Sequence, residues 1–220
     1  MLPAPKLIAA PVSAPNKTVS ADMLAQLAQS ASTKLRLGDL IGAINAATSA
    51  IDAGATDARL FVDRAEAYNR TKQYQKAYND AVQAVRTDPS SARAWQNLAW
   101  SQLKLRRFHE ALMAAEEAVK RNPDDATNFA VRAYAKEVLG NRKGAMADLE
   151  SAALLNRRFR EKLVAAKDGA KIYDPNEDST LGDTVASAAS PNSRWRLIGL
   201  GFGGLAGLLG LASLLLGRRR

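Results

Sequence analysis

Residues 92–123 read ARAWQNLAWSQLKLRRFHEALMAAEEAVKRNP and contain two helical patterns in succession. Apolar side chains recur every three or four positions, which places them on one face of an α-helix. The two faces are formed by Trp95, Leu98, Ala99 and Leu103, and then by Ala111, Leu112, Ala115 and Ala118. Pro123 closes the stretch, and proline cannot continue a helix. The stretch therefore predicts two helices joined by a short turn.

The same pattern recurs with a period of 34 residues. Three columns at this spacing hold alanine in every unit: Ala31, Ala65, Ala99 and Ala133; Ala43, Ala77, Ala111 and Ala145; Ala50, Ala84, Ala118 and Ala152. A fourth column is large and apolar: Leu27, Phe61, Trp95 and Phe129. One helix pair cannot bury both of its faces, so the pairs must stack. We expect an all-α, right-handed superhelical solenoid over 21–157, with units near 24–57, 58–91, 92–125 and 126–157.

The fourth unit departs from this pattern at two positions. Arg142 stands in the column that holds Leu40, Tyr74 and Phe108, and Arg157 stands where Pro89 and Pro123 close the preceding units. We therefore expect a shorter or distorted fourth unit. A basic capping helix is expected to follow over 158–171 and to pack Phe159 and Leu163 against the last unit.

The repeat pattern resembles the tetratricopeptide repeat (TPR) family. The second and third units carry the resemblance most fully, through Phe61, Ala65, Tyr68, Tyr74, Ala77, Ala84 and Pro89, and through Trp95, Leu98, Ala99, Phe108, Ala111, Ala118 and Pro123. It implies that the first helix of each pair lines a concave groove, which binds an extended peptide or a helix of a partner protein. Carried over by register, the groove residues are Arg59, Val62, Glu66, Asn69, Arg93, Gln96, Asn97, Trp100, Lys104, Tyr134 and Glu137.

Trp100 allows two interpretations: an aromatic hot spot in the groove, or a second core tryptophan between repeats. Arg59 and Arg93 are suited to an acidic segment of a partner. Some family members bind chaperone tails through a carboxylate clamp of paired lysine and asparagine. Val62 and Glu66 stand at clamp positions here, which argues against such a clamp.

An uncharged stretch of 21 residues, LIGLGFGGLAGLLGLASLLLG, covers 197–217. As a helix it would span about 30 Å, the thickness of a bilayer's hydrocarbon core. Residues suited to the membrane interface flank it: Arg194, Trp195, Arg196, Arg218, Arg219 and Arg220. We expect a single C-terminal transmembrane helix within an anchor at 194–220. A buried helix of a globular domain is the alternative interpretation.

Gly199, Gly203 and Gly207 lie close to one face of the expected transmembrane helix. Such spacing permits helix–helix association and so a homo-oligomer, although a glycine-rich span also produces it by accident. The Pro/Ala-rich residues 1–20 predict a flexible arm without a convincing signal peptide. The simplest topology is a tail anchor with the repeats on the cytosolic side. A bacterial surface-sorting tail is the alternative, and 172–193 reads as an acidic, flexible tether.

The chain has no cysteine and one histidine, His109. A cysteine nucleophile is excluded, and no phosphate loop, metal-ligand cluster or nucleophile motif is found. We therefore predict no enzyme activity, catalytic residue, metal or cofactor. Much of the net charge of +9 lies in the anchor flanks and the cap, so nucleic acid is not the expected partner.

The preferred function is a membrane-anchored adaptor that binds proteins through the groove. One alternative is an assembly or polypeptide-translocation receptor on an organelle or bacterial membrane. Another is an RNA- or lipid-binding protein that uses the basic cluster at the cap, which comprises Arg157, Arg158, Arg160 and Lys162.

Overall fold

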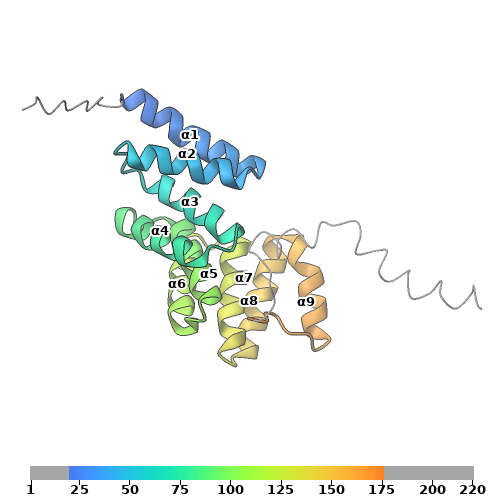
Figure 1. Ribbon diagram of the computed structural model, residues 1–220. Helices are drawn as coiled ribbons and strands as arrows, with labels where there is room; N and C mark the ends of the chain where they lie inside the picture. The colour runs from blue at the N-terminus through green and yellow to red at the C-terminus, as the bar shows by residue number, and fades with distance from the viewer. Residues whose placement is uncertain (1–19, 176–220) are drawn as a thin grey trace, which may run out of the picture.

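The computed structural model describes residues 20–175, which form stacked helix pairs (Figure 1). The pairs are α1 (Ala21–Leu37) with α2 (Leu40–Asp52), α3 (Ala58–Arg70) with α4 (Tyr74–Thr87), α5 (Ala92–Lys104) with α6 (Phe108–Arg121), and α7 (Ala126–Val138) with α8 (Arg142–Leu155). A 3₁₀ turn, η1 (Arg157–Phe159), leads into α9 (Arg160–Lys167). No strand occurs between residues 20 and 175. The predicted all-helical solenoid is confirmed for this part of the chain.

Capping side chains and the turn conformation determine where the helices begin and where the chain reverses. Side chains of Asp39, Asp57, Ser91, Asp125 and Asn141 accept hydrogen bonds from backbone N–H groups in the first turns of α2, α3, α5, α7 and α8. Inside each pair the turn contains a residue with positive φ: Gly38, Lys72, Arg106 and Gly140. These four positions lie 34 residues apart, so the turn repeats with the helices.

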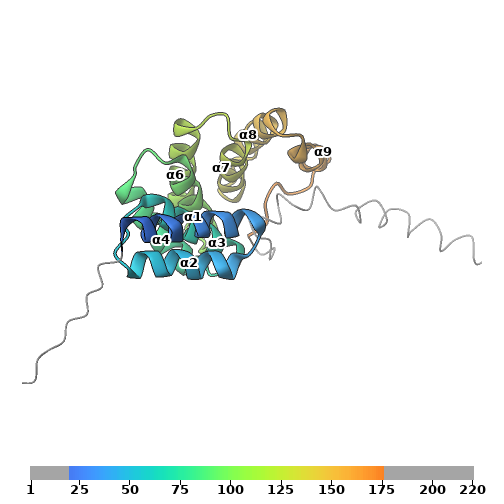
Figure 2. The ribbon, with the colours of Figure 1, turned by 90° about the horizontal axis from the view of Figure 1, so that it is seen from above.

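The alanine columns lie in the core of the solenoid. Ala31, Ala65, Ala99 and Ala133 are all 0% exposed, and the other two columns are likewise buried. The large apolar column, which holds Phe61, Trp95 and Phe129, is half-buried and packs against the core clusters. Figure 2 shows the pairs from above, with α1 and α2 at one end and α9 at the other.

The fourth unit is full length, so the expectation of a shorter unit was wrong. α7 and α8 have 13 and 14 residues, as α5 and α6 do. Arg142 takes a different role from the aromatic residues in its column. Its guanidinium donates to the carbonyl oxygens of Ala166 and Ala170, each at 2.7 Å, and to Glu137 at 2.5 Å. Arg142 therefore attaches α9 and the turn that follows it to the fourth pair.

The cap continues the packing of α8. Phe159 in η1 is 1% exposed, and Leu163 in α9 packs against the same core. No helix between residues 20 and 175 is long and apolar enough to cross a bilayer. The arm at 1–19 and the predicted transmembrane helix, with its glycines and arginine flanks, lie outside the described residues.

Two of the pairs contain a nearly buried ion pair at the same register. Arg64 donates to Asp80 at 2.7 Å, and Arg132 donates to Asp148 at 2.6 Å. The third unit places the apolar Leu98 at the equivalent of the arginine. The solenoid therefore accommodates either an ion pair or apolar residues at this contact.

Removing only one partner of the Arg64–Asp80 pair leaves an uncompensated charge. The two side chains are 14% and 10% exposed. We expect Asp80→Ala to lower the free energy of unfolding by about 3 kcal/mol, since the guanidinium stays in a desolvated position. Arg64→Leu combined with Asp80→Ala copies the third unit and should recover most of the loss. Urea denaturation measures both; a double variant no more stable than Asp80→Ala would contradict this account.

Candidate partner-binding groove

The first helices of the pairs, α1, α3, α5 and α7, bring one register column to a common face. This column holds Ser32, Glu66, Trp100 and Tyr134, spaced 34 residues apart. Neighbouring members of the α1, α3, α5, α7 series are in contact. The face has two parts: an N-terminal half between α1 and α3 that is hollowed, and a C-terminal half between α5 and α7 that is covered.

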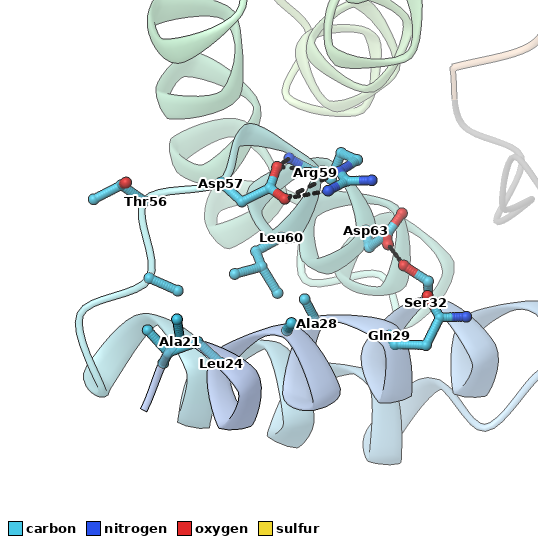
Figure 3. Close-up of a pocket in the computed structure, with 12 residues that line it drawn as sticks. Ala21, Leu24, Ala28, Gln29, Ser32, Thr56, Asp57, Arg59, Leu60 and Asp63 are labelled. Carbon is cyan, nitrogen blue, oxygen red and sulfur yellow. Dashed lines mark hydrogen bonds and ion pairs between the residues drawn. The ribbon is translucent and has the colours of Figure 1, made fainter. Parts of the chain in front are cut away.

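The N-terminal half is a hollow of about 450 Å³ between α1 and α3 (Figure 3). It is lined by Ala21, Leu24, Ala25, Ala28, Gln29, Ser32, Ala55, Thr56, Asp57, Arg59, Leu60 and Asp63. Apolar atoms come from the alanines, Leu24 and Leu60, and polar side chains come from the middle of α1 and from the loop and helix of α3. The predicted groove set contained only Arg59 of these residues. Extending the 34-residue register of the predicted set to the first two units would have added Ala25, Ala28, Gln29, Ser32 and Asp63.

Ion pairs set the electrostatics of this half. Arg93 donates to Asp63 at 3.0 Å and to Glu66 at 2.7 Å, and Ser32 donates to Asp63 at 2.5 Å. Asp63 is only 4% exposed, so Arg93 compensates a buried carboxylate. The half-exposed Arg93 guanidinium is therefore already paired with two carboxylates of α3.

Arg59 differs from Arg93 in its exposure. Its side chain is 84% exposed and contacts Asp57 at 2.7 Å at the rim of the hollow. The side-chain hydrogen bond from Arg59 lowers the pKa of Asp57 below its usual value. The rim thus presents an exposed guanidinium beside an ionised carboxylate.

In the middle of this face, buried side-chain amides link successive first helices by hydrogen bonds. Asn97 donates to the carbonyl oxygen of Val62 at 3.1 Å, and Asn69 donates to the side-chain oxygen of Asn97 at 3.3 Å. All three residues are at most 3% exposed. Gln96 donates to Asn128 at 2.7 Å and so links α5 to α7. These predicted groove residues act as contacts between successive first helices.

The C-terminal half is filled by three aromatic rings. Trp100 and Tyr134 meet edge to face at 6.1 Å, and Tyr173 stacks on Tyr134 at 5.2 Å. The Lys104 ammonium lies over Trp100 and over Tyr173, at 5.3 and 5.5 Å from the ring centroids. Trp100 is 0% exposed, which favours the core interpretation of this residue.

Main-chain contacts accompany the rings. Glu137 accepts a hydrogen bond from the backbone N–H of Ile172 at 3.1 Å, and Lys162 donates to the carbonyl oxygen of Ile172 at 2.9 Å. Ile172 and Tyr173 are 0% and 3% exposed. They belong to the folded body, although the expected tether begins at residue 172. Their sequence signal is weak: two apolar residues between the basic cap and an acidic stretch.

Trp100 and an exposed methionine provide a matched test of the core role. Trp100→Ala should lower the free energy of unfolding by about 4 kcal/mol, because a large buried side chain leaves a cavity. Met113 is 67% exposed, and Met113→Ala should change it by less than about 0.5 kcal/mol. Chemical denaturation compares the two variants. Equal stability of Trp100→Ala and the unchanged chain would restore the hot-spot interpretation.

Comparison with known proteins gives one family match and several similar structures. Residues 92–125, the third unit, match the family described as tetratricopeptide repeat. No curated protein matches the chain. The structure is similar to TTC0263, a thermophilic TPR protein of Thermus thermophilus, with 18% identity and a TM-score of 0.58 over 66% of this chain and 82% of that one.

Two further solved structures are similar. The MamA protein has 16% identity and a TM-score of 0.57, over 80% of this chain and 97% of that one. The first TPR of Spaghetti (RPAP3), bound to the HSP90 peptide SRMEEVD, has 22% identity and a TM-score of 0.52, over 56% and 98%. The described residues therefore form a TPR-like solenoid, and their third unit carries the sequence pattern of the tetratricopeptide repeat family.

Proposed function

We propose that this protein is a membrane-anchored adaptor that binds an extended segment of a partner protein in the groove. The observation that carries this proposal is the hollow between α1 and α3. It combines an apolar floor, where Leu60 is 1% exposed, with polar groups at its margin. Pockets of this kind, with few polar groups placed around apolar surface, bind ligands specifically.

The rim indicates which partner segment fits. Both arginines are paired, but the Arg59 side chain is 84% exposed beside Asp57, whereas Arg93 is 52% exposed and bridges Asp63 and Glu66. A carboxylate on the partner would accept charge-assisted hydrogen bonds from Arg59. A small apolar side chain next to that carboxylate would fill the floor between Ala28 and Leu60. The expected ligand is therefore an extended peptide with an acidic residue beside an apolar one.

Binding through this rim should depend on Arg59. Peptides selected from a displayed random library against the full chain in nanodiscs are the probe. Arg59→Glu should weaken their binding at least about tenfold, because a charge-assisted contact becomes a repulsion. Arg86 is an exposed arginine on α4, a second helix, so Arg86→Glu is the matched charge reversal and should leave binding unchanged.

Two results would count against the adaptor proposal. One is a failure of the selection to enrich peptides that bind the full chain. The other is equal weakening by Arg59→Glu and Arg86→Glu, which would reduce the effect to the overall charge of the domain.

Membrane anchoring rests on the sequence at 194–220. The uncharged 21-residue stretch and its arginine flanks support a single membrane-spanning helix. Deleting 194–220 should release the protein from membranes during alkaline carbonate extraction, whereas the full chain should stay in the pellet. Deleting 1–19 removes a segment at the other end and should leave the protein with the membranes. Equal extraction of the full chain and the 194–220 deletion would contradict an integral anchor.

A further inference from the structure

We infer that the C-terminal half of the groove is a peptide subsite for an aliphatic–aromatic residue pair, and that Ile172–Tyr173 of the same chain occupies it as an internal ligand. The inference rests on the proposed function of the groove as a peptide receptor. It adds a second subsite, a ligand class for it, and a resident segment that a partner peptide must displace.

The backbone of the resident segment is bound as a peptide is bound. The N–H of Ile172 donates to Glu137 on α7, and its carbonyl oxygen accepts from Lys162 on α9. Arg142 donates to the carbonyl oxygen of Ala170, two residues earlier. Contacts to main-chain groups do not depend on side-chain identity, so a partner peptide of another sequence can make them if it adopts the same backbone path.

The side chains of the segment define the chemistry of the subsite. Tyr173 stacks on Tyr134 with an interplanar angle of 20° and meets Trp100 edge to face at 6.1 Å. The Lys104 ammonium lies 5.5 Å from the centroid of the Tyr173 ring, a cation–π arrangement. Ile172 is 0% exposed in the same apolar cluster. The subsite therefore selects a bulky aliphatic residue followed by an aromatic one.

The segment reaches the groove through an irregular stretch and not through a helix. α9 ends at Lys167, and Gly169 at φ +97° turns the chain back. Figure 1 shows the orange stretch after α9 turning toward α7. Lys171, at the start of the segment, is exposed and pairs with Asp174 at 2.9 Å. Residues 170–174 belong to no helix, so the segment can separate from α5 and α7 without unfolding a helix of the repeats.

The internal segment lowers the apparent affinity of partner peptides for the C-terminal half. A competing peptide binds only the fraction of molecules whose subsite is open, and its apparent affinity falls by that fraction. A partner that also engages the hollow between α1 and α3 gains from being held nearby when the subsite opens. The internal segment therefore favours partners that present both motifs over those that present one.

The direct test supplies the segment in trans. The probe is a fluorescein-labelled peptide, DGAKIYDPNE, which copies residues 168–177. Fluorescence anisotropy measures its binding to the full chain in nanodiscs, unchanged or with Ile172→Ser and Tyr173→Ser together. The double variant should bind the probe at least about tenfold more tightly than the unchanged chain, because its subsite is empty. A probe with serine at both positions should not bind.

A matched control separates the subsite from general loss of apolar surface. Leu154 and Leu155 are adjacent on α8 and are 84% and 46% exposed. Leu154→Ser with Leu155→Ser should bind the probe no better than the unchanged chain. A folded Ile172→Ser, Tyr173→Ser variant, judged by circular dichroism and a cooperative melt, that binds the probe no more tightly than the unchanged chain would overturn the inference.

A second measurement applies if the double variant fails to fold. The chain contains no cysteine, so Asp174→Cys gives one labelling site for bimane, a fluorophore that tryptophan quenches at short range. Trp100 contacts the neighbouring Tyr173, so bimane should be quenched in the resident state. Excess DGAKIYDPNE should raise the emission, whereas the serine-substituted peptide should not. Unchanged emission at saturating peptide would overturn the inference.

The outcomes distinguish this inference from the proposed function. Peptides that depend on Arg59 report on the hollow between α1 and α3, which lies apart from Ile172 and Tyr173. If those peptides bind but the DGAKIYDPNE probe does not bind the C-terminal half, the inference of an internal ligand is wrong and the adaptor proposal is retained. If the probe binds the Ile172→Ser, Tyr173→Ser variant but no Arg59-dependent peptide is found, the proposed role of the hollow is wrong and the inference of an internal ligand is retained.

Discussion

Close contact between helices through alanine is the constraint on which the rest of the structure depends. The alanine columns, represented by Ala65, Ala99 and Ala133, are fully buried in the core. A small side chain brings helix axes together but buries little apolar area by itself, so no single pair holds a sufficient core. Stability must come from stacking, and stacking at a fixed spacing places the first helices side by side. The groove is therefore a consequence of how the core is packed.

The 34-residue period predicts which residues share a face, but it does not predict what covers them. Trp100 and Tyr134 lie in the register column expected for the groove, and a non-periodic segment buries both. Asn97 also lies in the expected register, yet it bonds to Val62 of the preceding unit and is buried. Register depends on local spacing along the chain, whereas cover depends on contacts between units and with the segment that follows α9. The sequence therefore predicts the register columns. It does not predict the hollow beside Asp63 or the burial of Trp100 and Tyr134 by the segment that contains Tyr173.

The fourth unit shows why a departure from a repeat pattern is not a defect. A solenoid must close its last face against solvent, and the closing residues cannot follow the column of the inner units. Arg142 replaces an aromatic residue so that its guanidinium can bind the carbonyl oxygens of Ala166 and Ala170. Glu137 pairs with Arg142 and also accepts from Ile172, so one polar network fixes both the cap and the segment in the groove.

In the internal-ligand inference, the residues that cap the C-terminal end of the described solenoid are also the ones that would bind a ligand. Each repeat contacts chiefly its neighbours, and Ile172 and Tyr173 contact residues of α5, α7 and α9. We therefore expect their displacement to leave the hollow between α1 and α3 unchanged. The two halves of the groove therefore differ in what a ligand must do to bind. The hollow between α1 and α3 is already open, whereas the C-terminal half accepts a ligand only after Ile172 and Tyr173 have left it. A ligand of the C-terminal half must make the apolar and aromatic contacts that Ile172 and Tyr173 make. We therefore expect it to carry an aliphatic residue followed by an aromatic one.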